Sequence, residues 1–352
     1  MGHFRLALAA GVLILGAFGL VACGSSGEDQ ITSPWPEATS ERTVAEPAKA
    51  PRWPLTGLPA ESAGAISRRI VSVKIENSAT ARPQSGLQGA DVVYETVVEG
   101  GITRFNALYQ STLPDPVGPV RSARLSDRYI VPQYHAIFTY SGASDSVDRA
   151  LAGVEFDNLS QDVGVAEPSY YRFSERAAPH NLYLHLDRLY EEAAQRDIAT
   201  TGSVQGFAFD TTLASGEDTP AVTQIDVPFS NANEVIWKYD AGSGTYLRWH
   251  NGDAHTDALT DEQISAKNVI VVWARYTLQS AVDVSGSNTY DITLVGSGRM
   301  TLFKNGQQYD GTWEMTEDAP PVFTDAEGSA IELAPGNTWF QVIDTGVNIT
   351  LK

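Results

Sequence analysis

Charged and polar side chains alternate with apolar ones in one short stretch of the chain, residues 94–106. Two strand-like runs flank a Gly-Gly pair there, an arrangement typical of a β-hairpin. With a two-residue loop at the glycines, every second residue falls on the same face of the hairpin. That face would carry a charge network able to bind a ligand or to pair internally, made of Glu95, Glu99, Arg104 and Asn106.

The next segment, residues 117–128, contains Arg121, Arg124 and Arg128, with Asp127 among them. A helix that starts near Arg121 turns by 100° per residue and would gather the three arginines within an arc of about 60°. Guanidinium groups beside the free N–H groups of a helix start suit an anion. The same arginines could instead pair with the two glutamates and hold the domain together. The sequence leaves both interpretations open.

Histidines give two further candidate positions. His180 and Asn181 follow a proline and precede a predicted helix, so His180 is either a capping or loop residue or part of a binding site. Near an Asn-Gly turn, His255 and Asp257 share a strand face at i and i+2, and Arg248 precedes them. This second group fits a polar site or a hydrogen-bonded turn equally well. Metal binding is the less favoured interpretation of it, and we expect no metal and no cofactor.

The elements that must position these residues fall into two bodies, separated by a polar, acidic segment at 211–226. Periodicity predicts a mixed α/β domain over 55–212 and a mostly-β domain, barrel or sandwich, over 228–352, which together make an α+β chain. In the first body we predict strands at 70–75, 91–98, 102–110 and 136–140 and helices at 122–131 and 181–196. In the second we predict strands at 234–239, 246–249, 268–273, 290–295, 299–303, 311–314 and 338–343.

Charge is distributed unevenly between these bodies. The chain has 352 residues and a formal charge of −19, of which residues 51–215 contribute −5 and residues 216–352 contribute −12. Such acidity argues against general nucleic-acid binding, which needs cations to neutralise phosphates. In the first body 13 of the 14 cations are arginines, which leaves room for a local anion site. The one cysteine excludes an internal disulfide and a cysteine zinc cluster.

The N-terminal residues predict a location. Residues 1–22 have a basic start and an uncharged apolar run that ends in small residues, as a secretory signal does. The sequence Leu20-Val21-Ala22-Cys23 resembles the bacterial lipobox, whose cysteine is diacylated after the signal is cut. We therefore expect a diacylglyceryl anchor at Cys23 on the extracytoplasmic face of the cell membrane. The alternative is an ordinary signal peptide or an anchor helix with a chance cysteine. Residues 23–54 predict a flexible acidic tether.

Five short motifs occur in order along the two bodies. They are Glu99-Gly100-Gly101-Ile102-Thr103-Arg104, Gly118-Pro119-Val120-Arg121-Ser122-Ala123-Arg124, Ala178-Pro179-His180-Asn181-Leu182-Tyr183, Asn268-Val269-Ile270-Val271 and Pro335-Gly336-Asn337-Thr338-Trp339. Together they resemble the YerB-like family of bacterial lipoproteins, over about residues 54–345. The resemblance implies a two-domain extracytoplasmic lipoprotein of unassigned biochemical function, with no catalytic residues to carry over.

These observations predict a lipid-anchored envelope protein that binds an anionic or glycan-like envelope ligand, a cell-wall component, or a partner protein. The alternative is an envelope hydrolase or transferase, with Glu99 or His180 as acid/base and Arg121 and Arg124 stabilising charge. A third possibility is a structural spacer. Convergence on one open cleft would favour binding or catalysis, whereas a sealed, fully paired network would count against both. The candidate ligand-binding residues are Glu95, Glu99, Arg104, Arg121, Arg124, Asp127, His180, Asn181, Arg248, His255 and Asp257.

Overall fold

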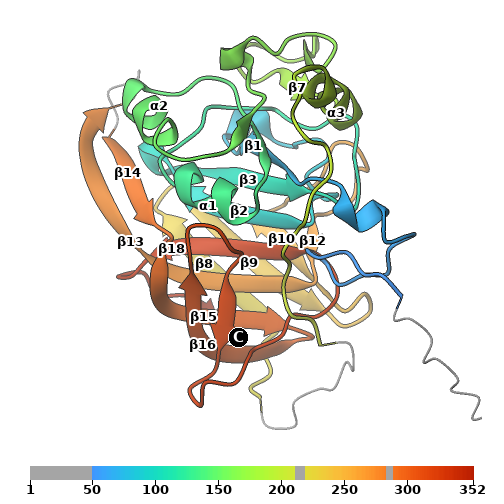
Figure 1. The fold of residues 1–352 in the computed structure, drawn as a ribbon. Helices are drawn as coiled ribbons and strands as arrows, with labels where there is room; N and C mark the ends of the chain where they lie inside the picture. The colour runs from blue at the N-terminus through green and yellow to red at the C-terminus, as the bar shows by residue number, and fades with distance from the viewer. Residues whose placement is uncertain (1–49, 211–218, 283–287) are drawn as a thin grey trace, which may run out of the picture. The chain divides into compact units, whose positions relative to one another are not determined.

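The computed structural model describes residues 50–210, 219–282 and 288–352 (Figure 1). Residues Lys49–Lys352 form one compact unit. The predicted signal peptide, Cys23 and most of the predicted tether lie outside the described residues. Trp53, at the end of the predicted tether, is buried in the compact unit, with the Arg68 guanidinium 5.2 Å from its ring centroid.

Strands outnumber helices in the described residues, and the fold is α+β as predicted, with a mixed first half and a mostly-β second half (Figure 1). The α-helices are α1 (Asp127–Gln133), α2 (Asp145–Leu151) and α3 (Leu186–Gln195). Short 3-10 turns are η1 (Ala65–Ser67), η2 (Ala79–Ala81), η3 (Glu99–Gly101) and η4 (Gln161–Val163). The strands of the first half are β1 (Val71–Glu76), β2 (Val92–Val97), β3 (Thr103–Tyr109), β4 (Ile137–Thr139), β5 (Asp157–Asn158), β6 (Tyr170–Arg172) and β7 (Leu182–Leu184). Those of the second half are β8 (Gln224–Ser230), β9 (Asn233–Asp240), β10 (Thr245–His250), β11 (Asp253–Ala254), β12 (Ser265–Ala266), β13 (Asn268–Val282), β14 (Asn288–Thr293), β15 (Gly296–Lys304), β16 (Gln307–Met315), β17 (Val322–Thr324), β18 (Thr338–Asp344) and β19 (Thr350–Leu351).

The main sheet contains strands from both predicted bodies. Its order is β17-β16-β15-β13-β18-β2-β3-β1-β4-β5, with β14 paired to β13. The halves meet where β18 runs parallel to β2, in register from Thr338 opposite Val92 to Gln341 opposite Glu95. A second sheet has the order β11-β10-β9-β8-β19, with β12 paired to β10, and β6 pairs with β7 separately. The predicted domain boundaries at residues 212 and 228 therefore stay a prediction. The main sheet contains strands from both sides of these boundaries.

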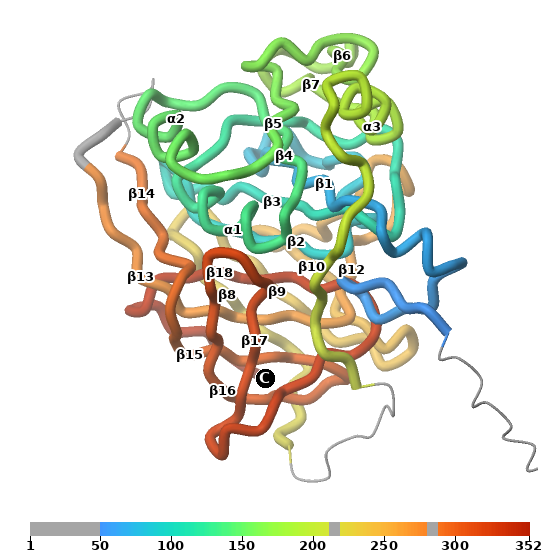
Figure 2. The backbone as a smooth tube through the Cα atoms, viewed as in Figure 1, coloured from blue at the N-terminus to red at the C-terminus, as the bar shows by residue number. Residues whose placement is uncertain are grey.

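Both faces of the main sheet are covered, which explains why its central strands are buried on both sides. One face packs on the second sheet, through residues such as Phe105, Trp237 and Trp339. The other face packs under α1 and α2, through residues such as Tyr94 and Phe138. Figure 2 follows this layering, with α1 and α2 in front of β2 and β3 and the second sheet behind. Alternate residues of each strand thus serve two different cores.

The two predicted helices are wrong in their first halves. Helix α1 begins only at Asp127, so Arg121 and Arg124 lie on an irregular segment before it. The backbone there bonds to distant strands instead of forming a helix: Arg121 N–H donates to the Lys74 carbonyl at 2.8 Å. Likewise, the stretch predicted as a helix from 181 begins with strand β7, and α3 starts at Leu186. Non-local backbone pairing overrides local helical spacing at both places.

The predicted hairpin forms, but its register differs by one residue. Val98 N–H donates to the Ile102 carbonyl at 2.8 Å, which closes a three-residue turn over Glu99–Gly101 in place of a two-residue loop. Both glycines of the turn have positive φ, 72° and 73°. Glu95 consequently pairs with Phe105, on the face opposite Arg104 and Asn106. The single polar face predicted for the hairpin is therefore wrong, since a one-residue slip reverses every side chain.

Glu95 instead faces the second sheet, where it forms an ion pair with Arg248 of β10. The Arg248 Nη2 lies 2.9 and 3.0 Å from the two carboxylate oxygens, and both side chains are fully buried. Thr103 Oγ1 also donates to Glu95 Oε1 at 2.7 Å. The ring centroids of Trp339, Trp237 and Phe105 lie 5.2 to 5.6 Å from the guanidinium carbon. Cation–π attraction therefore compensates Arg248 Nε and Nη1, which have no hydrogen-bond partner among the described residues.

Neutralising this carboxylate should destabilise the whole compact unit. In Glu95→Gln, the buried Arg248 charge loses its counter-ion, and we expect a loss of about 3–5 kcal/mol in the free energy of unfolding. Equilibrium unfolding in urea measures it. The matched control is Glu191→Gln, which breaks the exposed pair with Arg188 and should cost less than about 1 kcal/mol. Equal losses in the two variants would contradict the assignment.

Candidate anion-binding site

The predicted site residues divide between the two faces of the main sheet. Glu95, Arg248, His255 and Asp257 lie in the interior between the sheets, where none of them is more than 3% exposed. Glu99, Arg104, Arg121, Arg124 and Asp127 lie on the face that carries α1, where His180 also reaches Glu76, whereas Asn181 hydrogen-bonds to the turn and strand beside it. The candidates therefore do not all converge on one cleft, because the interior group lies on the opposite side of the sheet from Arg104 and Arg124.

The interior group ties loops to sheets and is closed to a ligand. Asp257 accepts hydrogen bonds from the backbone N–H groups of Gly86 at 2.9 Å, Gln88 at 2.7 Å and Leu259 at 2.8 Å. His255 Nε2 lies 2.7 Å from the Gln84 Oε1. These contacts favour the hydrogen-bonded turn over the polar binding site. Within the described ranges, no three side chains of the His, Cys, Asp and Glu types are arranged to hold a metal ion.

On the other face, polar side chains form a row across three strands. Arg104 of β3 lies at the centre, opposite Thr96 of β2 on one side and Glu76 of β1 on the other. The segment before α1 continues the row, because Val120 forms an antiparallel β-bridge with Ile75 of β1. Alternation along β1 and β3 thus presents polar groups at one end of the sheet.

Glu76 connects two of the predicted residues, although the sequence analysis missed it. Its two carboxylate oxygens each lie 2.9 Å from His180 Nδ1, and Oε2 lies 3.3 Å from Arg121 Nε. Glu76 is only 2% exposed, whereas the side chains of His180 and Arg121 are 26% exposed. The sequence did contain a signal for Glu76. It directly follows a predicted strand and lies two residues after Lys74, so the two side chains share one face of the extended strand.

His180 is carried on a turn between β6 and β7 that is held against the body. Arg176 donates to the carbonyls of Ala81 at 2.7 Å and Pro83 at 2.6 Å. Asn181 accepts from Arg172 at 2.9 Å, so its side chain stabilises the β6–β7 pair and does not reach the row. The turn therefore fixes His180 over Glu76.

Arg104 and Arg124 lie side by side. Both donate through Nη1 to the Ser122 carbonyl, Arg104 at 2.9 Å and Arg124 at 3.4 Å. Glu99 is engaged by Arg124, with its Oε2 2.7 Å from Nε and 2.5 Å from Nη2. Arg104 is 4% exposed, and its Nε has no hydrogen-bond partner among the described residues, nor does the Thr96 hydroxyl beside it. Burial, with the neighbouring charge of Arg124, lowers the pKa of Arg104 to about 9.

Asp127 supports this group from beneath. Its Oδ1 lies 2.7 Å from Lys74 Nζ, and both side chains are fully buried. Its Oδ2 accepts from the Arg124 backbone N–H at 2.6 Å. Burial lowers the pKa of Lys74, and Asp127 opposes the shift. Asp127 therefore positions the arginine segment and is inaccessible to a ligand.

The resulting arrangement has more positive than negative charge at a partly exposed surface. Three guanidiniums, which we call the arginine cluster (Arg104, Arg121 and Arg124), face two carboxylates, Glu76 and Glu99. Guanidinium forks bind phosphate or carboxylate oxygens in pairs. An imidazole oriented by a carboxylate can also transfer protons. The cluster is thus equipped to hold an anion next to a proton-transfer group.

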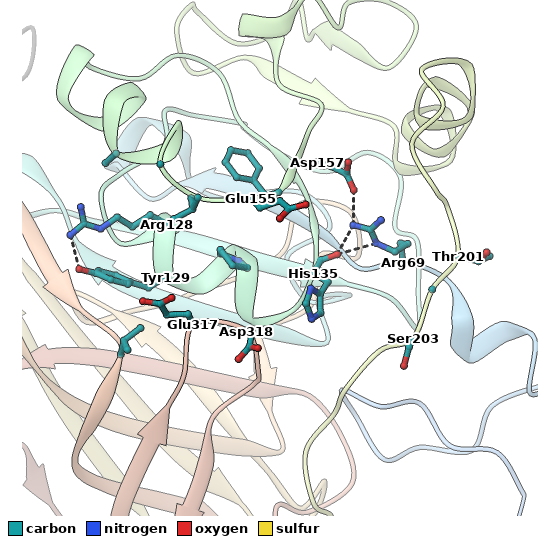
Figure 3. Close-up of a pocket in the computed structure, with 17 residues that line it drawn as sticks. Arg69, Arg128, Tyr129, His135, Glu155, Asp157, Thr201, Ser203, Glu317 and Asp318 are labelled. Atoms are coloured by element: carbon teal, nitrogen blue, oxygen red, sulfur yellow. Dashed lines mark hydrogen bonds and ion pairs between the residues drawn. The ribbon is translucent and has the colours of Figure 1, made fainter.

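A pocket of about 1170 Å³ lies at the opposite end of β1, away from the arginine cluster. Figure 3 shows Glu155 and His135 on one side of it and Glu317 and Asp318 on the other. Arg128 lines this pocket and pairs with Asp291 at 2.7 Å, so its predicted grouping with the other two arginines is wrong. No spacing signal could have found the pocket, because its walls come from distant segments.

Comparisons with known proteins agree on one family. Models described as "Protein of unknown function (DUF3048)" match this chain with their N-terminal domain over residues 55–199 and their C-terminal domain over residues 225–340. The Bacillus subtilis (strain 168) protein named "Putative lipoprotein YerB" is 29% identical over 301 residues, 85% of this chain and 88% of that protein. A crystal structure of YerB protein from Bacillus subtilis matches with a TM-score of 0.76 and 28% identity, covering 86% of this chain and 99% of that chain.

The buried histidines predict a loss of stability in acid. Burial, with Arg248 adding to it, lowers the pKa of His255 well below its ordinary value and that of His250 to about 2. Below about pH 6.5 the unfolded chain binds protons at these residues and the folded chain does not, so stability is full above that pH and is lost below it. We expect His255→Gln to remove about 1 kcal/mol of the wild-type loss between pH 6.5 and 5.5, measured by urea unfolding, because the unfolded histidine is already half protonated at pH 6.5. The exposed His135→Gln should leave the loss unchanged, and a His255→Gln variant that behaves like it would contradict the prediction.

Proposed function

Because this chain belongs to the YerB family, with both DUF3048 domains, we propose that it is a lipid-anchored, extracytoplasmic binding protein. It holds an anionic group of a cell-envelope component at the arginine cluster. The membrane is thus one partner, through Cys23, and the envelope component is the other.

Two observations support the anchor. The lipobox-like sequence places the one cysteine of the chain directly after an apolar leader. The relative from Bacillus subtilis carries the word lipoprotein in its name. Across the described residues, no helix has the length and apolar character needed to span a bilayer. Two or more acyl chains hold a protein at a membrane stably, where one chain does not.

The environment of Arg104 is the observation that carries the binding proposal. A buried guanidinium is costly unless its charge and its N–H groups are compensated. Within the part of the chain that the structure describes, the Arg104 guanidinium makes one hydrogen bond, to the Ser122 carbonyl, and burial together with the neighbouring Arg124 lowers its pKa. An anion that reaches Arg104 between Arg121 and Arg124 would supply the missing negative charge and the missing acceptor. A tetrahedral group such as sulfate or phosphate has enough oxygens to accept hydrogen bonds from several guanidinium groups at once.

Lipidation is tested by replacing the anchor residue. In Cys23→Ser, no thiol is available to acylate, so we expect the protein to move from the membrane fraction to the soluble fraction and to lose incorporation of labelled palmitate. Fractionation and mass measurement of the mature N-terminus check this. The control is the wild-type chain treated identically. Membrane retention of Cys23→Ser would contradict the anchor.

Anion binding is tested with inorganic phosphate and the full chain in a neutral detergent. We expect calorimetry to give a phosphate affinity that falls at least about tenfold in Arg121→Gln/Arg124→Gln, because charge-assisted hydrogen bonds are worth about 1.5–3 kcal/mol each. Circular dichroism should show that this double variant remains folded.

A matched control separates a site from general electrostatics. Arg188→Gln/Arg196→Gln removes the same charge from α3 and the residue that follows it, where Arg188 pairs with the exposed Glu191 and Arg196 with the half-buried Glu192. Its phosphate affinity should equal that of the wild type. Equal weakening in the two double variants, or unfolding of the Arg121/Arg124 variant, would favour a purely structural network.

A further inference from the structure

We propose that the Glu76–His180 pair makes the arginine cluster a hydrolytic site for phosphate esters, with His180 as the proton-transfer residue. The inference rests on the anion binding proposed above and adds a reaction and a substrate class to it. Of the two acid/base candidates from the sequence, Glu99 and His180, we retain His180 and add Glu76 as its supporting carboxylate.

The geometry first excludes Glu99 as the base. Its carboxylate is held by two nitrogens of Arg124, at 2.7 and 2.5 Å, and is 8% exposed. A carboxylate gripped by a guanidinium at two points is a poor proton acceptor, because protonation would break both charge-assisted contacts. Glu99 therefore fixes Arg124 in place, and the proton must move elsewhere.

His180 has the orientation that a proton-transfer residue needs. Its Nδ1 lies 2.9 Å from each oxygen of the buried Glu76 carboxylate. A carboxylate accepts only, so Nδ1 carries the hydrogen, and in the neutral imidazole the lone pair is on Nε2. Nε2 is on the side of the ring away from Nδ1, and the His180 side chain is 26% exposed. Glu76 also stabilises the imidazolium that forms when Nε2 takes a proton.

The arginines are close enough to act on the same substrate. Arg121 Nε and His180 Nδ1 both contact Glu76 Oε2, at 3.3 and 2.9 Å, so the two nitrogens are within about 6 Å of each other. Arg104 stands opposite Glu76 in the strand register, and Arg124 shares the Ser122 carbonyl with Arg104. A phosphoryl group bound there would have guanidiniums along its non-bridging oxygens, where charge must be stabilised in phosphoryl transfer.

The reaction is the addition of water across the ester bond. His180 Nε2 takes a proton from the attacking water while its oxygen forms the new bond to phosphorus. The phosphorus–oxygen bond to the alcohol breaks on the opposite side of the phosphorus, and the leaving oxygen keeps the electron pair and takes a proton from solvent. The imidazolium gives its proton back to solvent, so the products are inorganic phosphate and the free alcohol, with His180 returned to its neutral form. Water is the only co-substrate, and no oxidant or reductant is consumed.

The test uses the full chain in a neutral detergent with p-nitrophenyl phosphate as the probe. We expect release of p-nitrophenol by the wild type and a fall in kcat of at least about 100-fold in His180→Asn, the usual range for loss of an acid–base residue. Phosphate affinity, measured by calorimetry, should change less than about threefold, because the arginine cluster remains.

The matched control is His185→Asn. His185 also pairs through Nδ1 with a carboxylate, that of Asp115, but lies outside the arginine cluster. Its kcat should be that of the wild type. Equal losses of kcat in the His185→Asn and His180→Asn variants would overturn the proposal. Such a result would mean that a histidine–carboxylate pair contributes only to the structure.

A second variant covers the case in which His180→Asn does not fold. Glu76→Gln keeps the shape of the side chain and removes the charge that stabilises the imidazolium. We expect a lower kcat and an acid limb of the pH–rate profile moved to lower pH. The charged groups around His180 that this variant keeps include Arg121, which shares Glu76 with it, Arg104, which lies opposite Glu76 in the strand pair, and Arg176 of the same turn. An unmoved acid limb would overturn the assignment.

The outcomes for the wild type separate the two proposals. Phosphate binding without p-nitrophenol release would leave the binding function standing and overturn the hydrolytic one. Absence of both would overturn both. Release of p-nitrophenol at the wild-type rate by a folded His180→Asn would overturn the role of His180.

Discussion

The buried ion pair between Glu95 and Arg248 is the constraint around which the two sheets are assembled. Neither charge has access to water, so each depends on the other and on the aromatic rings around the guanidinium. The pair fixes β2 of the main sheet against β10 of the second sheet. It also fixes which face of β3 turns outward, and hence places Arg104 on the side of α1. The polar surface site is thus a consequence of the interior packing.

A second carboxylate, Glu76, holds basic side chains together at the surface, as Glu95 holds Arg248 in the interior. It is nearly as buried, but its partners, Arg121 and His180, remain partly exposed. The difference lies in the strand ends: β1 stops at Glu76, so the groups that reach it come from a loop and a turn. Loops on a rigid sheet are where proteins commonly place functional groups. Rigid support beneath these loops comes from the Lys74–Asp127 pair.

The sequence was informative wherever structure is local. Strand-like runs of residues predicted β1, β2 and β3, and the many such runs after residue 228 predicted the mostly-β second half. It failed where distant backbone groups compete. The stretch before α1 has helical spacing, yet Arg121 N–H bonds to the Lys74 carbonyl. At Glu99–Gly101, one additional residue in the turn moved Glu95 to the other face. The pairing of Glu76 with His180 spans 104 residues, which no periodicity can reveal.

The parallel pairing of β18 with β2 has a consequence for how the chain matures. Strand β2 is made more than 200 residues before β18, yet each supplies a neighbour that completes the other's hydrogen bonding. A nascent chain would hold one edge of β2 open until β18 has emerged. Contacts so distant in sequence form slowly, and open edges invite association with other chains. A protein that crosses a membrane as an extended chain folds only after export. Both strands are then present on the same side of the membrane, so β18 can cover the open edge of β2 as soon as folding begins.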